Sequence, residues 1–248
     1  MGTKHIQKIC IILFYIVSIN GIAQVKKQAA FTFNYNYQIP SGAMANIFNN
    51  NSSVGSTYFI ETNKNLVFGA ECNYLFAPTI SNPNIFENIN TNEGAIIGAD
   101  GYYTNIHVMQ RGLEFYLFTG YAFHLMENNL SGFYLNQGIG YLQHQIFIDT
   151  KNQNIPQLNE EMKKGYDRFS NGLSTKLSVD YKYYHKKGRF QFGAGVNYTI
   201  AYTKNQRLYN FAENKYYSQE RNLDKLLGFR FEIIFPIKRK NEEKFHYY

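Results

Sequence analysis

Two stretches of the chain alternate between large apolar residues and small or polar ones with a period of two. The first runs from 173 to 183, and after a short polar break the second runs from 190 to 203. Successive side chains of a β-strand point to opposite faces, so each stretch predicts a long strand with one apolar face. About ten residues of such alternation are what a strand needs to cross a membrane. The pair is therefore typical of a hairpin in an outer-membrane β-barrel.

The same alternation predicts six further strands. They cover 30–38, 54–62, 66–76, 103–125, 132–149 and 224–237. An even number of antiparallel strands can close into a barrel without leaving an exposed edge. The sequence therefore predicts an all-β fold class, an eight-stranded antiparallel transmembrane β-barrel.

The predicted connections alternate in length. Long ones cover 39–54, 77–102, 150–168 and 204–223, whereas short turns lie near 63–65, 126–131 and 185–188. Outer-membrane barrels have long extracellular loops and short periplasmic turns, so we expect both termini in the periplasm. A soluble lipocalin-like barrel is the structural alternative, because periodicity does not tell the inside of a barrel from its outside.

The N-terminus has the composition of an export signal. Lys4 and Lys8 precede an apolar run at 9–17, and small residues follow at 21–23. The run is shorter than a membrane-spanning helix, which favours a cleaved signal over a retained helical anchor. We expect a protein of the outer membrane of a Gram-negative bacterium, with a signal peptide at 1–23, a barrel at 24–237 and a charged periplasmic tail at 238–248.

Composition and charge reduce the number of possible partners and structural features. The formal net charge is +7, but the lysines and arginines are scattered, which argues against a nucleic-acid partner. The chain has 22 tyrosines, 21 phenylalanines and no tryptophan, which favours aromatic girdles at the membrane interfaces, with a biased genome as the alternative explanation. Removal of the signal leaves Cys72 as the remaining cysteine, so no intramolecular disulfide is expected.

Charged residues also occur on the polar faces of the predicted strands. The interior of an eight-stranded barrel is just wide enough for its own side chains. Opposite charges there are expected to pair and fill the lumen, so we predict no pore. The predicted lumen charge network comprises Glu71, Glu114, Lys176, Asp180, Lys182, Arg230 and Glu232.

Catalytic and metal-binding motifs are lacking. The six histidines show no metal-ligand spacing. The two Gly-x-Gly pairs at 138–140 and 193–195 lack the third glycine of a dinucleotide loop and lie inside strands, where glycine relieves crowding. His144 with a serine or aspartate is conceivable as a lipid hydrolase, but no nucleophile motif accompanies it. We expect no catalytic residue, no cofactor, no metal and no enzyme activity.

The connection at 150–168 is charged and punctuated by Pro156 and Gly165. One interpretation is a folded loop that caps the barrel mouth, with Asp167 and Arg168 as an ion pair. The other is an extracellular docking surface. We favour the first. Basic turns and the tail on the other side are either solvated ends or contacts to a periplasmic protein. Candidate partner contacts are Lys164, Gly165, Tyr166, Asp167, Arg168, Lys186, Lys187, Lys238 and Arg239.

Several sequence blocks occur in a recognisable order along the chain. The most specific is Lys-Gly-Tyr-Asp-Arg at 164–168; the others are Gly-Ile-Gly-Tyr-Leu-Gln-His-Gln-Ile at 138–146, Ile-Pro-Gln-Leu at 155–158, and shorter blocks at 94–101, 110–112 and 226–230. Together they resemble the motifs of a Bacteroidetes outer-membrane barrel family that includes the PorG-like component of the type IX secretion and gliding machinery. The resemblance implies a structural barrel whose partners are outer-membrane lipid and a periplasmic ring, built from a lipoprotein and its partner, which the barrel ties to the membrane.

Two other functions stay open at this point. One is a surface adhesion or ligand-binding barrel, with loops 77–102 and 204–223 as the binding elements. The other is a lipid-modifying barrel enzyme that uses His144.

Overall fold

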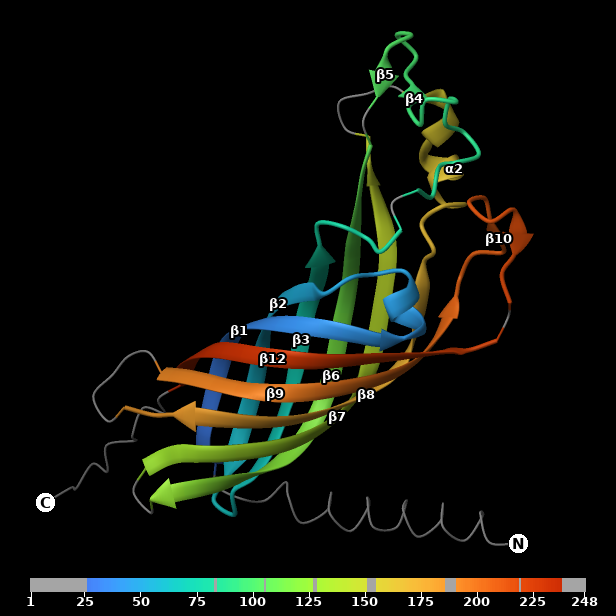
Figure 1. Ribbon diagram of the computed structural model, residues 1–248. Helices are drawn as coiled ribbons and strands as arrows, with labels where there is room; N and C mark the ends of the chain where they lie inside the picture. The colour runs from blue at the N-terminus through green and yellow to red at the C-terminus, as the bar shows by residue number, and fades with distance from the viewer. Residues whose placement is uncertain are drawn as a thin grey trace, which may run out of the picture.

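The main body of the protein is a closed barrel of eight antiparallel strands (Figure 1). The computed structural model describes residues 26–82, 84–104, 106–126, 129–150, 155–185, 191–218 and 220–237. The barrel strands are β1 Lys26–Gly42, β2 Asn51–Thr62, β3 Leu66–Ala77, β6 His107–Met126, β7 Asn129–Asp149, β8 Ser170–Tyr183, β9 Gln191–Asn205 and β12 Asn222–Ile237. Each strand pairs with its neighbour along the chain, and β1 pairs with β12 to close the ring. The predicted fold class is confirmed.

The alternation of the sequence separates an outer face from an inner face. On β8, Leu173, Leu177 and Val179 are exposed, whereas Lys176 and Asp180 on the alternate row are buried. The other barrel strands repeat this arrangement, and we call their exposed outward row the apolar belt. It includes Phe33, Val54, Tyr74, Leu117, Ile139, Leu177, Val196 and Phe229, one from each barrel strand.

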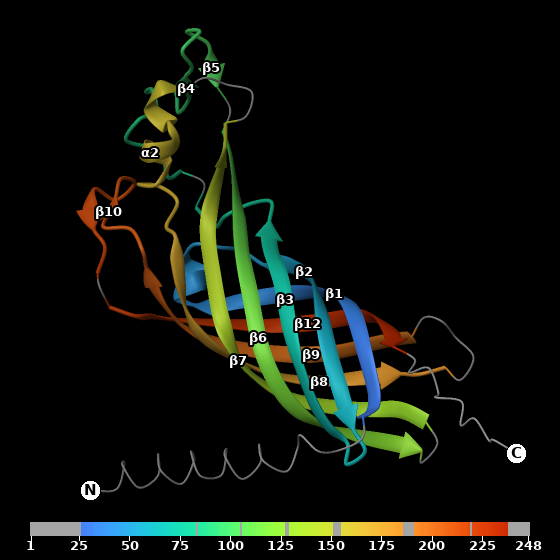
Figure 2. The same ribbon diagram turned by 180° about the vertical axis from the view of Figure 1, so that it is seen from behind.

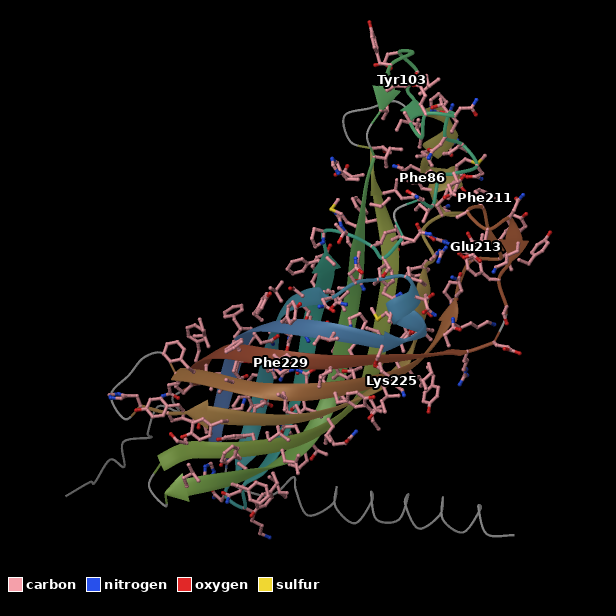
Figure 3. The ribbon with its side chains drawn as sticks, in the orientation of Figure 1. Phe86, Tyr103, Phe211, Glu213, Lys225 and Phe229 are labelled. Atoms are coloured by element: carbon pink, nitrogen blue, oxygen red, sulfur yellow. The ribbon has the colours of Figure 1, made fainter. Side chains whose placement is uncertain are left out.

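The apolar belt excludes the lipocalin-like alternative. A soluble barrel would bury these large side chains, but here they cover the outside and the charged side chains fill the inside. Phe229 lies on the outer face of β12, and Lys225 follows on the same face nearer the loops (Figure 3). An exterior band of this kind is solvated by lipid hydrocarbon, with polar residues beginning at its rim.

The two ends of the barrel differ. Ala29 on β1 pairs with Ile237 on β12, so the first strand begins and the last strand ends at the same end, which we call the turn end. The tight turn at 63–65 also lies there, with Asn65 in the left-handed conformation at φ 62°. The predicted signal peptide at 1–23 and tail at 238–248 lie outside the described residues.

Two predicted segments, one connection and one strand, have the wrong bounds. The connection expected at 39–54 is confined to 43–50, because β1 continues to Gly42 and β2 begins at Asn51. The strand expected at 103–125 begins only at His107, since Tyr103 belongs to a separate short strand. In both places local alternation does not reveal where a neighbouring strand is available for pairing.

The β6–β7 pair rises above the rest of the barrel at the loop end (Figures 1 and 2). These strands have 20 and 21 residues, against 12 each in β2 and β3. The long connections carry their own short elements: η1 Ala43–Asn46, β4 Ile96–Ile97, β5 Tyr103–Thr104, η2 Pro156–Leu158, α2 Glu160–Lys163, β10 Tyr209–Asn210 and β11 Lys215–Tyr216. No helix among the described residues has the length and apolar character needed to cross a membrane.

Candidate functional site

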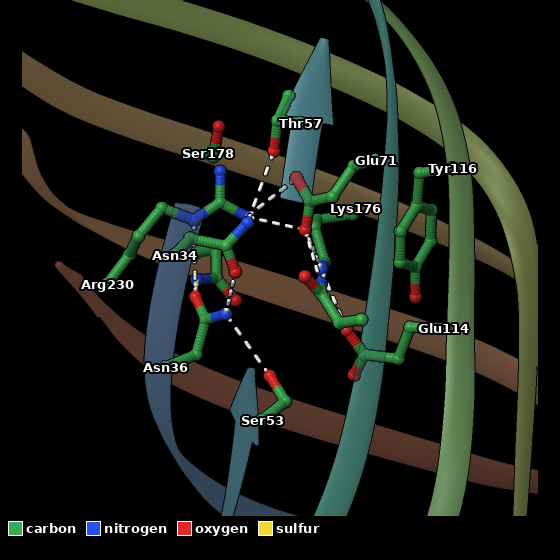
Figure 4. Close-up of polar contacts among 12 residues, drawn as sticks. Asn34, Asn36, Ser53, Thr57, Glu71, Glu114, Tyr116, Lys176, Ser178 and Arg230 are labelled. Atoms are coloured by element: carbon green, nitrogen blue, oxygen red, sulfur yellow. Dashed lines mark hydrogen bonds and ion pairs between the residues drawn. The ribbon is translucent and has the colours of Figure 1, made fainter. Parts of the chain in front are cut away.

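All seven residues of the predicted lumen charge network are buried inside the barrel. Nη2 of Arg230 lies 2.6 and 2.7 Å from the two carboxylate oxygens of Glu71. Nζ of Lys176 lies 3.0 Å from Glu71 and 3.0 Å from Glu114, so it bridges two carboxylates from different strands (Figure 4). These contacts compensate charges that would otherwise be costly to bury.

The network continues toward the turn end. Nζ of Lys182 lies 2.9 Å from Glu232 and above the rings of Phe59 and Tyr134, at 4.1 and 5.1 Å from their centroids. Asp180 lies 4.0 Å from Nη1 of Arg230. The structure therefore joins the seven residues into pairs that cross the lumen between strands.

Buried amides extend the network beyond the predicted charges. Gln38 donates to Glu114 at 2.9 Å, Asn73 donates to Glu71 at 2.6 Å, and Asn36 accepts from Arg230 at 3.2 Å. These three amides are not among the seven residues predicted for the network. Their positions on the polar rows predict that they face inward, but not which charge they reach.

Two apolar clusters enclose the charged layer. At the turn end, Phe59, Tyr134 and Ile234 pack together, and at the loop end Phe48, Leu142 and Leu226 belong to a larger cluster. A cavity beside Glu71, Lys176 and Arg230 measures about 20 Å³, which is space for a single water. Across the part of the chain that the structure describes, side chains therefore fill the lumen.

His144, the candidate for a lipid hydrolase, pairs with an acid. Its Nε2 lies 3.1 Å from Asp224, which also accepts a hydrogen bond from Thr203, and Phe48 packs edge-on against its ring. No hydroxyl or thiol of the described residues hydrogen-bonds to His144, as activation of a nucleophile would require. No group of three or more metal-ligating side chains occurs in the described ranges.

The Lys-Gly-Tyr-Asp-Arg block at 164–168 lies at the centre of the loop assembly, which we call the loop cap (residues 78–104, 155–169 and 206–221 as far as described). Tyr166 is 3 % exposed and packs against Phe86 and Phe211 from the two other loops (Figure 3). Its hydroxyl donates to Asn88 at 3.1 Å. One buried tyrosine thus connects three long connections.

Gly165 is required by the same packing. A Cβ at this position would lie 2.0 Å from the ring of Phe211, and the Phe211 N–H donates to the Gly165 carbonyl at 3.0 Å. A glycine therefore lets the β9–β12 connection approach the backbone of the β7–β8 connection.

The predicted ion pair between Asp167 and Arg168 is wrong. Asp167 is paired with Arg207, and Arg168 lies 2.8 Å from Glu213. Both partners, Arg207 and Glu213, lie in the 206–221 connection. The two adjacent residues therefore attach the block to a different loop. Lys215 and Arg168 beside Glu213 hold the pKa of its carboxyl below the ordinary value.

The candidate partner contacts divide into accessible and inaccessible residues. Tyr166 and Asp167 are buried within the loop cap, which favours the capping-loop interpretation of this block over the docking surface. Lys164 is exposed, where it pairs with Glu161 at 2.8 Å. Lys186, Lys187, Lys238 and Arg239 lie outside the described residues.

No protein-family model and no curated protein matches this chain. Among solved structures, Neisserial surface protein A is similar at a TM-score of 0.43 and 8 % identity, over 85 % of this chain and 99 % of that one. The attachment invasion locus protein Ail of Yersinia pestis is similar at 0.42 and 8 %, over 85 % and 98 %. Outer membrane protein W of E. coli is similar at 0.36 and 14 %, over 87 % and 100 %.

The construction of this molecule defines its class. In a closed antiparallel barrel the strands pair their backbone groups with one another around the wall. Here the exterior is apolar, as contact with lipid hydrocarbon requires, and the interior is polar and charged. The chain has the fold of an eight-stranded outer-membrane β-barrel.

Proposed function

We propose that this protein is a non-enzymatic structural barrel of the outer membrane that anchors a periplasmic ring of the type IX secretion and gliding machinery. The observation that carries the structural part is the filled lumen. A charged layer enclosed by two apolar clusters suits a rigid anchor better than a conduit. The resemblance of the Lys-Gly-Tyr-Asp-Arg block and its companion motifs to the Bacteroidetes barrel family points to the particular machinery.

The proposal also assigns an orientation. We place the loop cap outside the cell and the turn end in the periplasm, following the loop lengths of outer-membrane barrels. The surfaces available to a periplasmic ring are then the turns and the predicted tail, which carry Lys186, Lys187, Lys238 and Arg239. Outer-membrane lipid is the other partner.

A capture experiment tests the proposal. The tagged mature protein is purified from detergent-solubilised outer membranes, and co-purifying proteins are identified by mass spectrometry. We expect the ring lipoprotein and its partner in amounts comparable with the barrel. Recovery of the barrel alone, from membranes in which the ring is intact, would contradict the proposal.

A pair of matched variants locates the contact. Replacement of Lys186 and Lys187 by alanine is expected to reduce capture of the ring, because these lysines lie in a predicted periplasmic turn. Replacement of Lys163 and Lys164 by alanine in the loop cap also removes two charges and is expected to leave capture unchanged. Capture that is reduced by the replacements at 163 and 164, and unchanged by those at 186 and 187, would contradict the proposed orientation.

A surface adhesion barrel is the second candidate, and a specific observation favours it. Tyr102, Tyr103 and Tyr216 at the tips of two loops are largely exposed, and tyrosine is enriched in binding surfaces. Serine at all three positions, with loss of cell attachment and retained secretion, would favour adhesion over the secretion role.

The absence of enzyme activity is part of the proposal. The lipid-modifying alternative requires His144, whose Nε2 lies 3.1 Å from Asp224 and to which no hydroxyl or thiol of the described residues hydrogen-bonds. His144→Gln is therefore expected to leave the mass spectrum of lipopolysaccharide unchanged. A changed spectrum would favour the lipid-modifying enzyme.

A further inference from the structure

A polar side chain, Gln137, lies within the apolar belt on β7. The apolar part of the outward row of this strand runs from Phe133 to Tyr141, and Gln137 is at its centre. Thr119 on β6 is its direct partner in the register, and Thr175 on β8 is its hydrogen-bond partner. This polar patch, Thr119, Gln137 and Thr175, thus spans three adjacent strands at mid-depth of the lipid-facing surface.

The hydrogen bonds of the polar patch leave one strong acceptor without a donor. The Thr175 hydroxyl donates to the Gly138 carbonyl at 3.0 Å and accepts from Nε2 of Gln137 at 2.5 Å. Nε2 of Gln137 also makes a longer contact of 3.4 Å with the Gly138 carbonyl. No described residue donates to Oε1 of Gln137, which lies on the outside of the barrel. Lipid hydrocarbon supplies no donor, so an amide oxygen held there is unfavourable unless another protein satisfies it.

We propose that the polar patch is a two-fold interface at which two copies of this chain associate within the membrane. Both copies enter the bilayer in the same orientation, so the two-fold axis runs along the membrane normal. A residue near that axis meets its own counterpart at the same depth. An amide carries both a donor and an acceptor. In exchange for its 3.4 Å contact with the Gly138 carbonyl, Nε2 of each Gln137 can donate to Oε1 of the other.

The chemistry selects a second copy over other occupants. A lysine or a carboxylate at this position would repel its counterpart across a two-fold axis, whereas glutamine is self-complementary. The apolar side chains around the polar patch are among the most exposed of the belt: Leu117 at 61 %, Ile139 at 67 % and Leu173 at 69 %. Association would pack them against protein. On the other wall, the outward row of β12 is apolar through Leu227, Phe229 and Phe231.

Disulfide trapping in native membranes tests the interface. Cys72 is exposed and is first replaced by alanine. In that background Gln137→Cys is compared with Val196→Cys, an exposed position of the belt on β9. With a membrane-permeant oxidant we expect a disulfide-linked dimer at 137 and little at 196. Equal trapping at the two positions, or trapping of 137 to a different protein, would overturn the proposal.

Gln137→Cys removes the amide on which the proposed interface depends, so a second measurement tests the amide itself. Association of the mature protein in lipid vesicles is followed by energy transfer between labelled copies as the protein-to-lipid ratio is varied. We expect Gln137→Leu to raise the dissociation constant about tenfold and Gln137→Asn to retain most of the association. Unaltered association of Gln137→Leu would contradict the proposed two-fold interface. Heat-modifiable gel mobility shows that each variant is folded. The outcome is independent of ring capture, so this inference stands apart from the proposed function.

Discussion

At the scale of single residues, burial determines what each charge contributes. Lys176 lies between two carboxylates in the lumen, whereas Lys164 forms a similar pair on the surface of the loop cap. Ion pairs at the surface contribute about 0–1 kcal/mol because water and salt screen them. Removal of one member of a buried pair leaves an uncompensated charge in a region with space for about one water.

Lys176→Met is therefore expected to lower the free energy of unfolding by about 3–5 kcal/mol, since Glu71 and Glu114 lose the cation between them. Urea unfolding of the protein in lipid vesicles measures the change. Lys164→Met is the matched control and is expected to change it by less than about 1 kcal/mol. Equal effects of the two substitutions would mean that the lumen is hydrated.

Gly165→Ala is expected to loosen the loop cap without unfolding the barrel. The added Cβ would lie 2.0 Å from the Phe211 ring, so the 206–221 connection must move. We expect faster proteolysis within that connection while the barrel remains resistant. The control is Lys164→Ala, which changes an exposed neighbour; cleavage at the rate of the native protein in Gly165→Ala would contradict the packing.

At the scale of elements, the long β6–β7 pair supports the loop cap. Ile146 and Ile148 on the extended part of β7 pack in one apolar cluster with Phe86 and Tyr166 of the loops. The cap thus folds against a wall of the barrel, and ion pairs fasten its connections to one another. Arg168 with Glu213 is one such fastening.

The Glu213 contacts are expected to weaken in acid. Lys215 and Arg168 lower the pKa of the folded Glu213 carboxyl below its ordinary value of 4.5. A lowered pKa means that this stabilisation is present above the unfolded value and is lost as the pH falls through the folded one. Hydrogen exchange of the 206–217 amides, corrected for intrinsic rates, is therefore expected to speed up below about pH 4.5.

The variant Glu213→Gln isolates the contribution of this carboxyl. It is expected to reduce protection at neutral pH and to flatten the acid response of the same amides. The amides of the barrel strands serve as the internal control. A response that is unchanged in the variant would assign the acid sensitivity to other carboxylates of the cap.

At the scale of the whole molecule, side chains fill the interior of the barrel. The turn-end cluster, the charged layer and the loop-end cluster follow one another along the lumen axis. A barrel of this strand number has room for side chains and little else.

The whole protein is accordingly expected to show no discrete conductance steps in planar lipid bilayers. The filled lumen leaves no continuous path for hydrated ions across the described residues. Insertion is verified independently by resistance of the barrel to added protease. Stable channel openings with the native protein, absent from a mock reconstitution, would contradict the closed lumen.

Local alternation was enough to predict the strands and which residues share a face. Lys176 and Leu177 point to opposite faces because successive residues of any extended chain do so. The strand number and the grouping of the charges on one face follow from this local rule. The boundaries at Gly42 and His107 do not, since they depend on the neighbouring strand. That the charged face is the inner one was predicted from the export signal and the aromatic residues, and the closed barrel confirms it.

Only the tertiary structure decided which residues meet. Lys176 and Glu71 are 105 positions apart and become partners because closure of the barrel brings β8 and β3 to opposite sides of one lumen. Asp167 pairs with Arg207 rather than with Arg168, because the loop cap has no periodic pattern and its pairing is set by how three connections pack. Strand geometry is local and readable along the chain, whereas contacts across a lumen or between loops depend on the closed barrel.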